Sequence, residues 1–165
     1  KFGADVCRFY MLGFLQTYEK CSYREDELIS AYNTFLANNY GNLLNRLLHL
    51  AVQKDIKIPD DSKIKNEFKD KINTMKSKIE SEYENFELNK AVSVINDMVS
   101  FGNQYIHEKE PWKQGIRHAE TTLNNVCYLL IKASELYEQI IPNGAGKAIE
   151  AINKKEKLIL YPKIK

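Results

Sequence analysis

Apolar residues recur every three or four positions along most of this chain, with charged and polar residues between them. This spacing is typical of amphipathic α-helices, which have about 3.6 residues per turn. Proline and glycine, which interrupt helices, number only 4 and 7 among 165 residues. The pattern therefore predicts an all-α fold, a helical bundle with short connections, organised as one domain over residues 1–165.

The same spacing locates the individual helices. Ser22 and Glu25 form a candidate capping box before the second helix. Asp61 or Ser62 is a candidate cap for the third helix, which reaches Tyr83. The tail over residues 155–165 is expected to be extended and to pack back on the domain. The other expected helices cover residues 4–18, 25–53, 86–106, 115–138 and 144–152.

The expected helix over residues 25–53 carries two separate stripes. The first stripe is apolar, spans roughly 120° of the helix circumference and should face the core. The second stripe is polar and contains no carboxylate. Within it, Asn42 and Arg46 have i, i+4 spacing, so both side chains emerge on one face. The apolar stripe consists of Leu36, Tyr40, Leu43, Leu44, Leu47, Leu50 and Ala51, and the polar stripe of Asn38, Asn42, Arg46, His49 and Gln53.

These residue types permit two interpretations. An amide offers a donor and an acceptor, and a guanidinium offers a rigid fork of donors, so Asn42 and Arg46 can hydrogen-bond the edge of a base. The alternative is an ordinary solvated helix face. Trp112, the only tryptophan, follows Pro111 at a helix break. Its ring is either a core anchor or a platform that stacks on an unpaired base.

The overall charge and the positions of the cysteines limit the kinds of site, compartment and partner that are expected. A net charge of +2 and a pI near 8.3 are too mild to indicate nucleic acid by themselves, so any basic surface must be local. Cys7, Cys21 and Cys127 are far apart and form no CxxC pair, which argues against a zinc knuckle. Scattered cysteines fit a reducing cytosol, so we expect a cytoplasmic protein in which Cys7 and Cys127 are buried. No apolar run approaches the ~20 residues that span a bilayer, so no membrane partner is expected.

No catalytic or metal centre is predicted. His49, His107 and His118 lack a close metal-ligand spacing and are interpreted as surface or hydrogen-bonded side chains. The MKSK segment at residues 75–78 lies in an amphipathic pattern and is interpreted as a solvated helix face. The GAGK segment at residues 144–147 lacks the strand and the Ser or Thr of a phosphate-binding loop, which favours a helix start.

Several segments together resemble one family. KFGADVCRFY at residues 1–10 resembles the YGADALRYYLL segment that follows the catalytic domain in class I aminoacyl-tRNA synthetases. NYGNLLNR at residues 39–46 resembles the NLGNLxxR segment of methionyl-tRNA synthetases. EPWK at residues 110–113 matches their PW motif and follows NQYI at residues 103–106, which matches their NxYI pattern. The closing LYPKI at residues 160–164 resembles their LFPRI.

The resemblance spans nearly the whole chain in order and implies a helical bundle of the class I anticodon-binding type. It implies that the chain reads the CAU anticodon of tRNA(Met). In the family, the residues matching Asn42 and Arg46 hydrogen-bond the first anticodon base, the residue matching Trp112 stacks on it, and Pro111 shapes the same corner. The implied partners are the anticodon loop and the enzyme's own catalytic domain, with no role for DNA. Tyr40 departs from the family pattern, which has leucine before Gly41.

The resemblance also implies what this chain does not hold. The ATP and methionine site would lie upstream of Lys1, so we expect no cofactor here and no methionine activation by this chain alone. Two alternatives stay open: the equivalent domain of another class I synthetase, such as the leucine, valine or cysteine enzyme, and a helical protein-interaction module without an RNA role. An exposed, carboxylate-free stripe of Asn42, Arg46 and Gln53 adjoining Trp112 would favour RNA, whereas burial of Trp112 far from Arg46 would favour the module.

Overall fold

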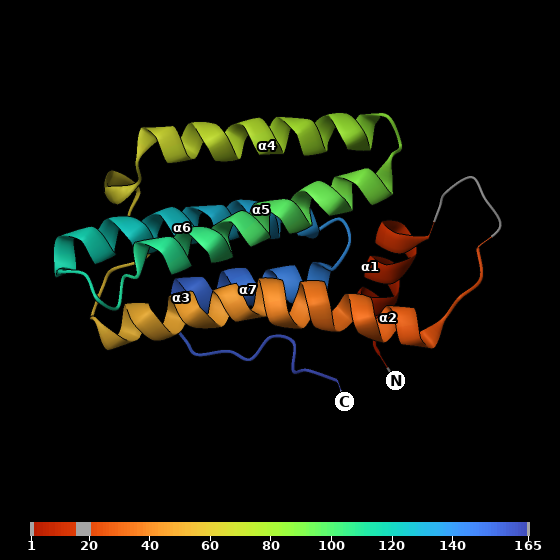
Figure 1. Ribbon diagram of the computed structural model, residues 1–165, viewed down its shortest axis with the longest axis horizontal. Coiled ribbons are helices and arrows are strands. Elements are labelled where there is room, and N and C mark those ends of the chain that lie inside the picture. The colour runs from red at the N-terminus through yellow and green to blue at the C-terminus, as the bar shows by residue number, and fades with distance from the viewer. Residues whose placement is uncertain (1, 16–20, 165) are drawn as a thin grey trace.

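The structure is a computed structural model that describes residues 2–15 and 21–164, and within these ranges it contains helices and no β-strand. The predicted all-α fold is confirmed. Figure 1 shows the helices as a bundle with both ends of the chain on the same side. The elements are α1 (Ala4–Phe14), α2 (Glu25–Ala31), η1 (Tyr32–Gly41), α3 (Asn42–Gln53), η2 (Asp61–Lys63), α4 (Asn66–Glu84), α5 (Leu88–Lys109), α6 (Ile116–Tyr137) and α7 (Pro142–Lys154).

Elements α2, η1 and α3 follow one another without a break, so the long helix expected over residues 25–53 is confirmed. Its middle part, η1, is a π-helix, which the sequence pattern did not predict. Such helices have i→i+5 hydrogen bonds and occur frequently at functional sites. A Cβ added to Gly41 would lie 3.0 Å from the carbonyl oxygen of Leu36. Glycine therefore suits the point where the π-helix returns to the α-helix.

Helix α5 lies in the middle of the bundle, between α4 on one side and the α2–α3 helix on the other (Figure 1). Gly102 of α5 allows this close approach, because a Cβ there would lie only 2.6 Å from Cδ2 of Leu43. No helix among the described residues is long and apolar enough to cross a bilayer. The predicted apolar stripe is buried at every position: Leu36, Tyr40, Leu43, Leu44, Leu47, Leu50 and Ala51.

The two cysteines that were expected to be buried differ in their surroundings. Cys127 lies in the core, and burial raises the pKa of its thiol to about 12. Cys7 is exposed, so its predicted burial is wrong. The reason is local: Val6 and Phe9 belong to the buried face of α1, and residue 7 points away from that face.

Two of the predicted helix caps are also wrong. Arg24, not Ser22, immediately precedes α2, and no side chain caps that helix. Asp61 and Ser62, the predicted caps of the third helix, lie instead inside the short η2 turn, which the side chain of Asp60 caps. Helix α4 starts later, after Lys65, whose backbone N–H donates to Oδ1 of Asn125 at 3.0 Å. A partner distant in sequence thus replaces a local cap.

The other helix ends agree with the expected ends within one turn. The exception is α1, which ends at Phe14, whereas the expected helix reached residue 18. Residues 16–18 of that expectation lie outside the described residues. The segment at residues 75–78 lies on α4, where Lys76 pairs with Glu80 at 3.4 Å, and residues 144–147 lie in the first turns of α7. Both interpretations of these segments as helix positions are confirmed.

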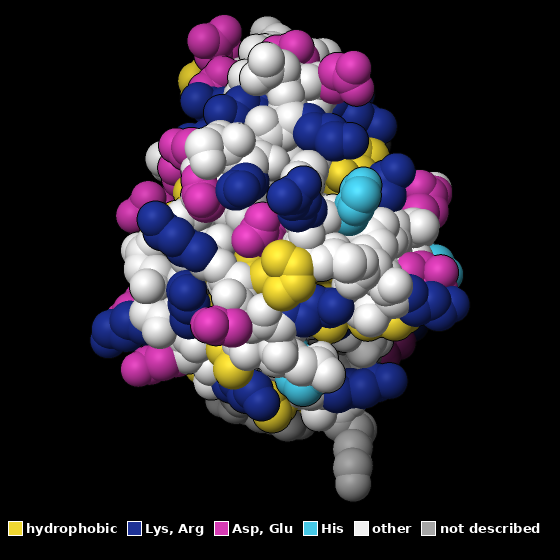
Figure 2. Space-filling model, turned by 90° about the vertical axis from the view of Figure 1, so that its left-hand side faces the viewer, with side chains coloured by type: hydrophobic (Ala, Val, Ile, Leu, Met, Phe, Trp, Pro, Cys, Tyr) yellow, Lys and Arg dark blue, Asp and Glu magenta, His cyan; other side chains and the backbone are white. Residues whose placement is uncertain are grey.

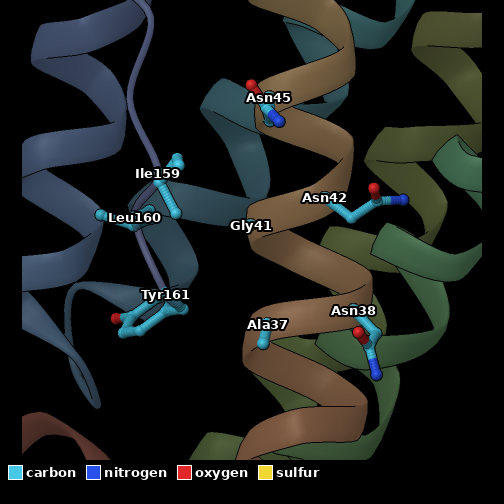
Figure 3. A pocket seen from close by; sticks show the side chains of 8 residues that line it. All are labelled: Ala37, Asn38, Gly41, Asn42, Asn45, Ile159, Leu160 and Tyr161. Carbon is cyan, nitrogen blue, oxygen red and sulfur yellow. The ribbon is translucent and has the colours of Figure 1, made fainter. Parts of the chain in front are cut away.

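After α7 the chain runs back along η1 and α3 without regular secondary structure (Figure 1). The hydroxyl of Tyr32 donates to the carbonyl of Pro162 at 2.7 Å. Asn33 exchanges two hydrogen bonds with the backbone of Ile164, each 2.9 Å long. A groove of about 300 Å³ lies between this tail and the long helix. In Figure 3, Tyr161 lies on the tail side of the groove, whereas Asn42, which also lines the groove, has its side chain directed away from the tail.

Candidate nucleic-acid interface

The first part of the site is on α3. Asn42 begins this helix and is exposed, and Arg46 lies one turn further on and is partly buried. Their positions along the helix axis differ by ~6 Å, at about 1.5 Å per residue. A single base edge extends over a similar distance. The expectation that Leu43, Leu44 and Leu47 would be buried while Asn42 and Arg46 remain accessible is confirmed.

The second part of the site is the turn that follows α5. Glu110 ends the helix in the left-handed conformation, with φ 43° and ψ 56°. The backbone N–H of Lys113 then donates to the carbonyl of Glu110 at 2.8 Å, which closes the turn. Pro111 is buried inside it, and Trp112 leaves 40% of its surface exposed. The turn therefore presents part of an aromatic ring to solvent.

Long-range hydrogen bonds hold this turn against its neighbours. Nζ of Lys54, which follows α3, donates to the carbonyl of Gln114 at 3.2 Å. The hydroxyl of Thr122 on α6 donates to the side-chain oxygen of Gln114 at 3.4 Å. The turn is thus connected to the end of α3 and to α6. This places the Trp112 ring in a defined position relative to α3.

Arg46 and Trp112 meet across the two elements. The guanidinium carbon of Arg46 lies 5.7 Å from the centre of the Trp112 ring, within the range of a cation–π contact. Burial lowers the pKa of the Arg46 guanidinium, but arginine stays charged at neutral pH. The structure therefore joins a positive hydrogen-bond donor to a partly exposed aromatic ring. Pro111 lies in the same corner.

Asn42 has a partner that the sequence analysis did not select as a site residue. Its Nδ2 donates to Oδ1 of Asn103 on α5 at 3.4 Å. The oxygen of the Asn42 amide has no partner within the described residues, so it is available as an acceptor. The NQYI segment contained Asn103, but nothing in its helical spacing indicated that it would meet Asn42. Only the packing of α5 on α3 reveals this contact.

Charged side chains of both signs lie around the site. Figure 2 views the molecule from the end where α3 stops and the turn after α5 lies, and Lys and Arg side chains are spread over this face with Asp and Glu side chains interspersed among them. The exposed residues near these two elements include Lys57, Arg117 and His49. Such cations can contact phosphates although the whole chain carries only +2.

Among the described residues, no group of three His, Cys, Asp or Glu side chains is placed to hold a metal ion. His49, His107 and His118 are all exposed. The interpretation of these histidines as surface residues is therefore confirmed. The candidate site consists of hydrogen-bonding, cationic and aromatic side chains.

Comparisons with known proteins agree with this architecture. The family model described as the anticodon binding domain of methionyl tRNA ligase matches residues 57–163. A second model, described as tRNA synthetases class I (M), matches residues 1–48.

Among solved structures, the methionyl-tRNA synthetase of Mycobacterium tuberculosis in its apo form aligns with a TM-score of 0.83 over 98% of this chain and 39% of that chain, at 20% identity. Its methionyl-adenylate-bound form aligns with a TM-score of 0.79 over 90% of this chain and 32% of that chain, at 22% identity. These two structures establish likeness of fold.

Curated relatives agree with the family models. The methionine–tRNA ligase of Ureaplasma parvum is 28% identical over 92% of this chain and 31% of its own length. The chloroplastic/mitochondrial methionine–tRNA ligase of Arabidopsis thaliana is 32% identical over 79% of this chain and 22% of its own length. The chain thus spans less than a third of the length of these two relatives.

The two matching family models place this chain among the helical domains of class I aminoacyl-tRNA synthetases. The match over residues 57–163 covers more than half of the chain. The chain therefore belongs to the family of anticodon-binding domains of methionyl-tRNA ligase.

Proposed function

We propose that this chain binds the anticodon loop of tRNA(Met) and reads the first base of the CAU anticodon with Asn42, Arg46 and Trp112. The observation that supports this most is the contact between Arg46 and the partly exposed Trp112 ring, with Asn42 one helical turn away. Unpaired loop bases are bound in this manner, by stacking on an aromatic ring and by hydrogen bonds to the Watson–Crick edge.

The hydrogen-bonding groups suit cytosine. The Watson–Crick edge of cytosine has one donor, the N4 amino group, beside two acceptors, N3 and O2. The free amide oxygen of Asn42 can accept from N4, and the guanidinium of Arg46 can donate to N3 and O2. Uracil would instead bring its O4 acceptor against the amide oxygen of Asn42. The arrangement therefore favours cytosine over uracil at the first position.

The alternative of a protein-interaction module without an RNA role has less support. That alternative expected Trp112 to be buried far from Arg46, whereas the two side chains are in contact and Trp112 is 40% exposed. The proposed setting is protein synthesis in the cytoplasm. There the chain works beside the catalytic domain of the ligase, and ATP and methionine bind to that domain, not to this chain.

Binding to short RNA hairpins tests the proposal. The chain is titrated with a hairpin whose loop contains CAU and with matched hairpins that carry UAU or AAU, at one fixed salt concentration. We expect preferential binding of the CAU hairpin, by about fivefold or more, because one well-placed set of base contacts contributes about 1–3 kcal/mol. Equal affinity for the three hairpins would contradict the proposed reading of the first base.

A further inference from the structure

We propose that Asn103 is a positioning residue, which orients the amide of Asn42 so that its oxygen faces the base. This inference rests on the proposed function and concerns how the site acquires its base preference. Asn103 lies on α5 and is only partly exposed. Its Oδ1 accepts from Nδ2 of Asn42 at 3.4 Å. Its own Nδ2 donates to the backbone carbonyl of Asn39 at 3.1 Å and to Oδ1 of Asn39 at 2.8 Å.

The direction of these hydrogen bonds is determined by chemistry. A backbone carbonyl only accepts, so the group of Asn103 that faces the Asn39 carbonyl must be its NH₂. The oxygen of Asn103 therefore points to Asn42. Asn42 must then present its own NH₂, because two carbonyl oxygens facing each other repel. The oxygen of Asn42 is left on the outer side as an acceptor.

The other end of this series of amides is anchored at a buried residue of α5, Asn96. Nδ2 of Asn39 donates to the backbone carbonyl of Asn96 at 3.2 Å and to Oγ of Ser100 at 3.0 Å. Ser100 in turn donates to the same carbonyl of Asn96 at 2.9 Å, and Asn96 is 4% exposed. Because this series of amides begins at a backbone carbonyl that can only accept, reversing the amide of Asn39 or of Asn103 would break the hydrogen bonds on both sides of it.

The fold brings these amides within reach of one another. Gly102, beside Asn103, has no side chain, which lets α5 approach Leu43 of α3 closely. Asn39 lies in the π-helix and Asn42 directly follows it, and both contact the same residue of α5. The close helix packing and the π-helix therefore both contribute to holding the Asn42 amide in one orientation.

Without Asn103, the Asn42 amide could turn over and present its NH₂ to the base. That NH₂ would face the N4 amino group of cytosine unfavourably but would suit the O4 of uracil. Loss of Asn103 should therefore change the preference between bases more than the overall affinity. A residue that merely supported the fold would weaken binding of both bases equally.

The experiment compares parent and Asn103→Leu chains in binding to the CAU and UAU hairpins. We expect the CAU-to-UAU ratio to fall by about fivefold or more, with affinity for the UAU hairpin unchanged or higher. Gln104→Leu is the matched control, because Gln104 is exposed on the same helix and, among the described residues, its side chain hydrogen-bonds only to Glu108, at 2.7 Å. The Gln104→Leu chain should have the same CAU-to-UAU affinity ratio as the parent chain. Circular dichroism checks folding, and Asn103→Ser replaces Asn103→Leu if the latter unfolds.

A double-mutant cycle separates positioning from direct contact. In an Asn42→Ala background, Asn103→Leu should leave the ratio unchanged, because no amide remains to be oriented. The inference is overturned if Asn103→Leu keeps the parent ratio within about twofold, or if it lowers the ratio as much in the Asn42→Ala background. A parent chain without any CAU preference would overturn the proposed function, and this inference with it.

Discussion

Removing the ring of Trp112 tests the aromatic part of the site most directly. In the Trp112→Ala chain the ring on which we propose that the first anticodon base stacks is removed, while Asn42 and Arg46 keep their positions on α3. Stacking of a base on an aromatic side chain contributes about 1–3 kcal/mol. We therefore expect affinity for the CAU hairpin to fall by about 5- to 150-fold. Trp112→Phe retains a smaller ring, so its affinity for the CAU hairpin should lie between the affinities of the parent and Trp112→Ala chains.

The same substitution should lower stability by less than the loss of a fully buried aromatic ring would. The ring is 40% exposed, and its contact with Arg46 at 5.7 Å contributes about 0.5–1 kcal/mol at an exposed site. The turn itself is held by Lys54 and by the hydrogen bond between Lys113 and Glu110, which remain. Urea unfolding should therefore show a loss of no more than about 2 kcal/mol.

Phe86→Ala is the matched control for Trp112→Ala. Phe86 is an aromatic residue with 72% of its surface exposed, in the connection between α4 and α5 at the opposite end of the bundle (Figure 1). Its removal should leave hairpin binding unchanged. Fluorescence anisotropy with labelled hairpins gives the affinities. If Trp112→Ala binds the CAU hairpin within about twofold of the parent chain, the proposed stack is wrong.

Three further outcomes are expected. Arg46→Ala should weaken binding of the CAU hairpin by about fivefold or more and lower the CAU-to-UAU affinity ratio, because its donors would contact N3 and O2 of cytosine; an unchanged ratio would contradict the proposed contact with the base. Gly102→Ala should lower the free energy of unfolding by about 1–3 kcal/mol in urea titrations, since the new Cβ would lie 2.6 Å from Leu43; an unchanged midpoint would show that α5 moves freely. In the native chain, exposed Cys7 should react with a maleimide within minutes. Cys127 should react only after unfolding, because burial raises the pKa of its thiol to about 12. Mass spectrometry of the labelled peptides distinguishes the two cysteines.

Local spacing was sufficient for the helices and for part of the site. The apolar residues Leu43, Leu44 and Leu47 repeat at helical spacing, so their burial followed from the sequence alone. The same geometry placed Asn42 and Arg46 on a common accessible face, because residues four apart lie one turn apart on any α-helix. These properties depend on neighbours within a few residues, and those neighbours are visible in the sequence.

Only the tertiary structure decided where the separate pieces of the site meet. The π-helix at η1, the 5.7 Å contact of Arg46 with Trp112 and the bond between Asn103 and Asn42 were not contained in any helical pattern. The last two contacts join residues about 60 positions apart, and their geometry depends on how closely α5 packs on α3. Gly102 sets that distance through the side chain that it lacks. A hydrophobic pattern specifies which face of a helix is buried, but the distance and register between two buried faces come from the packing of both.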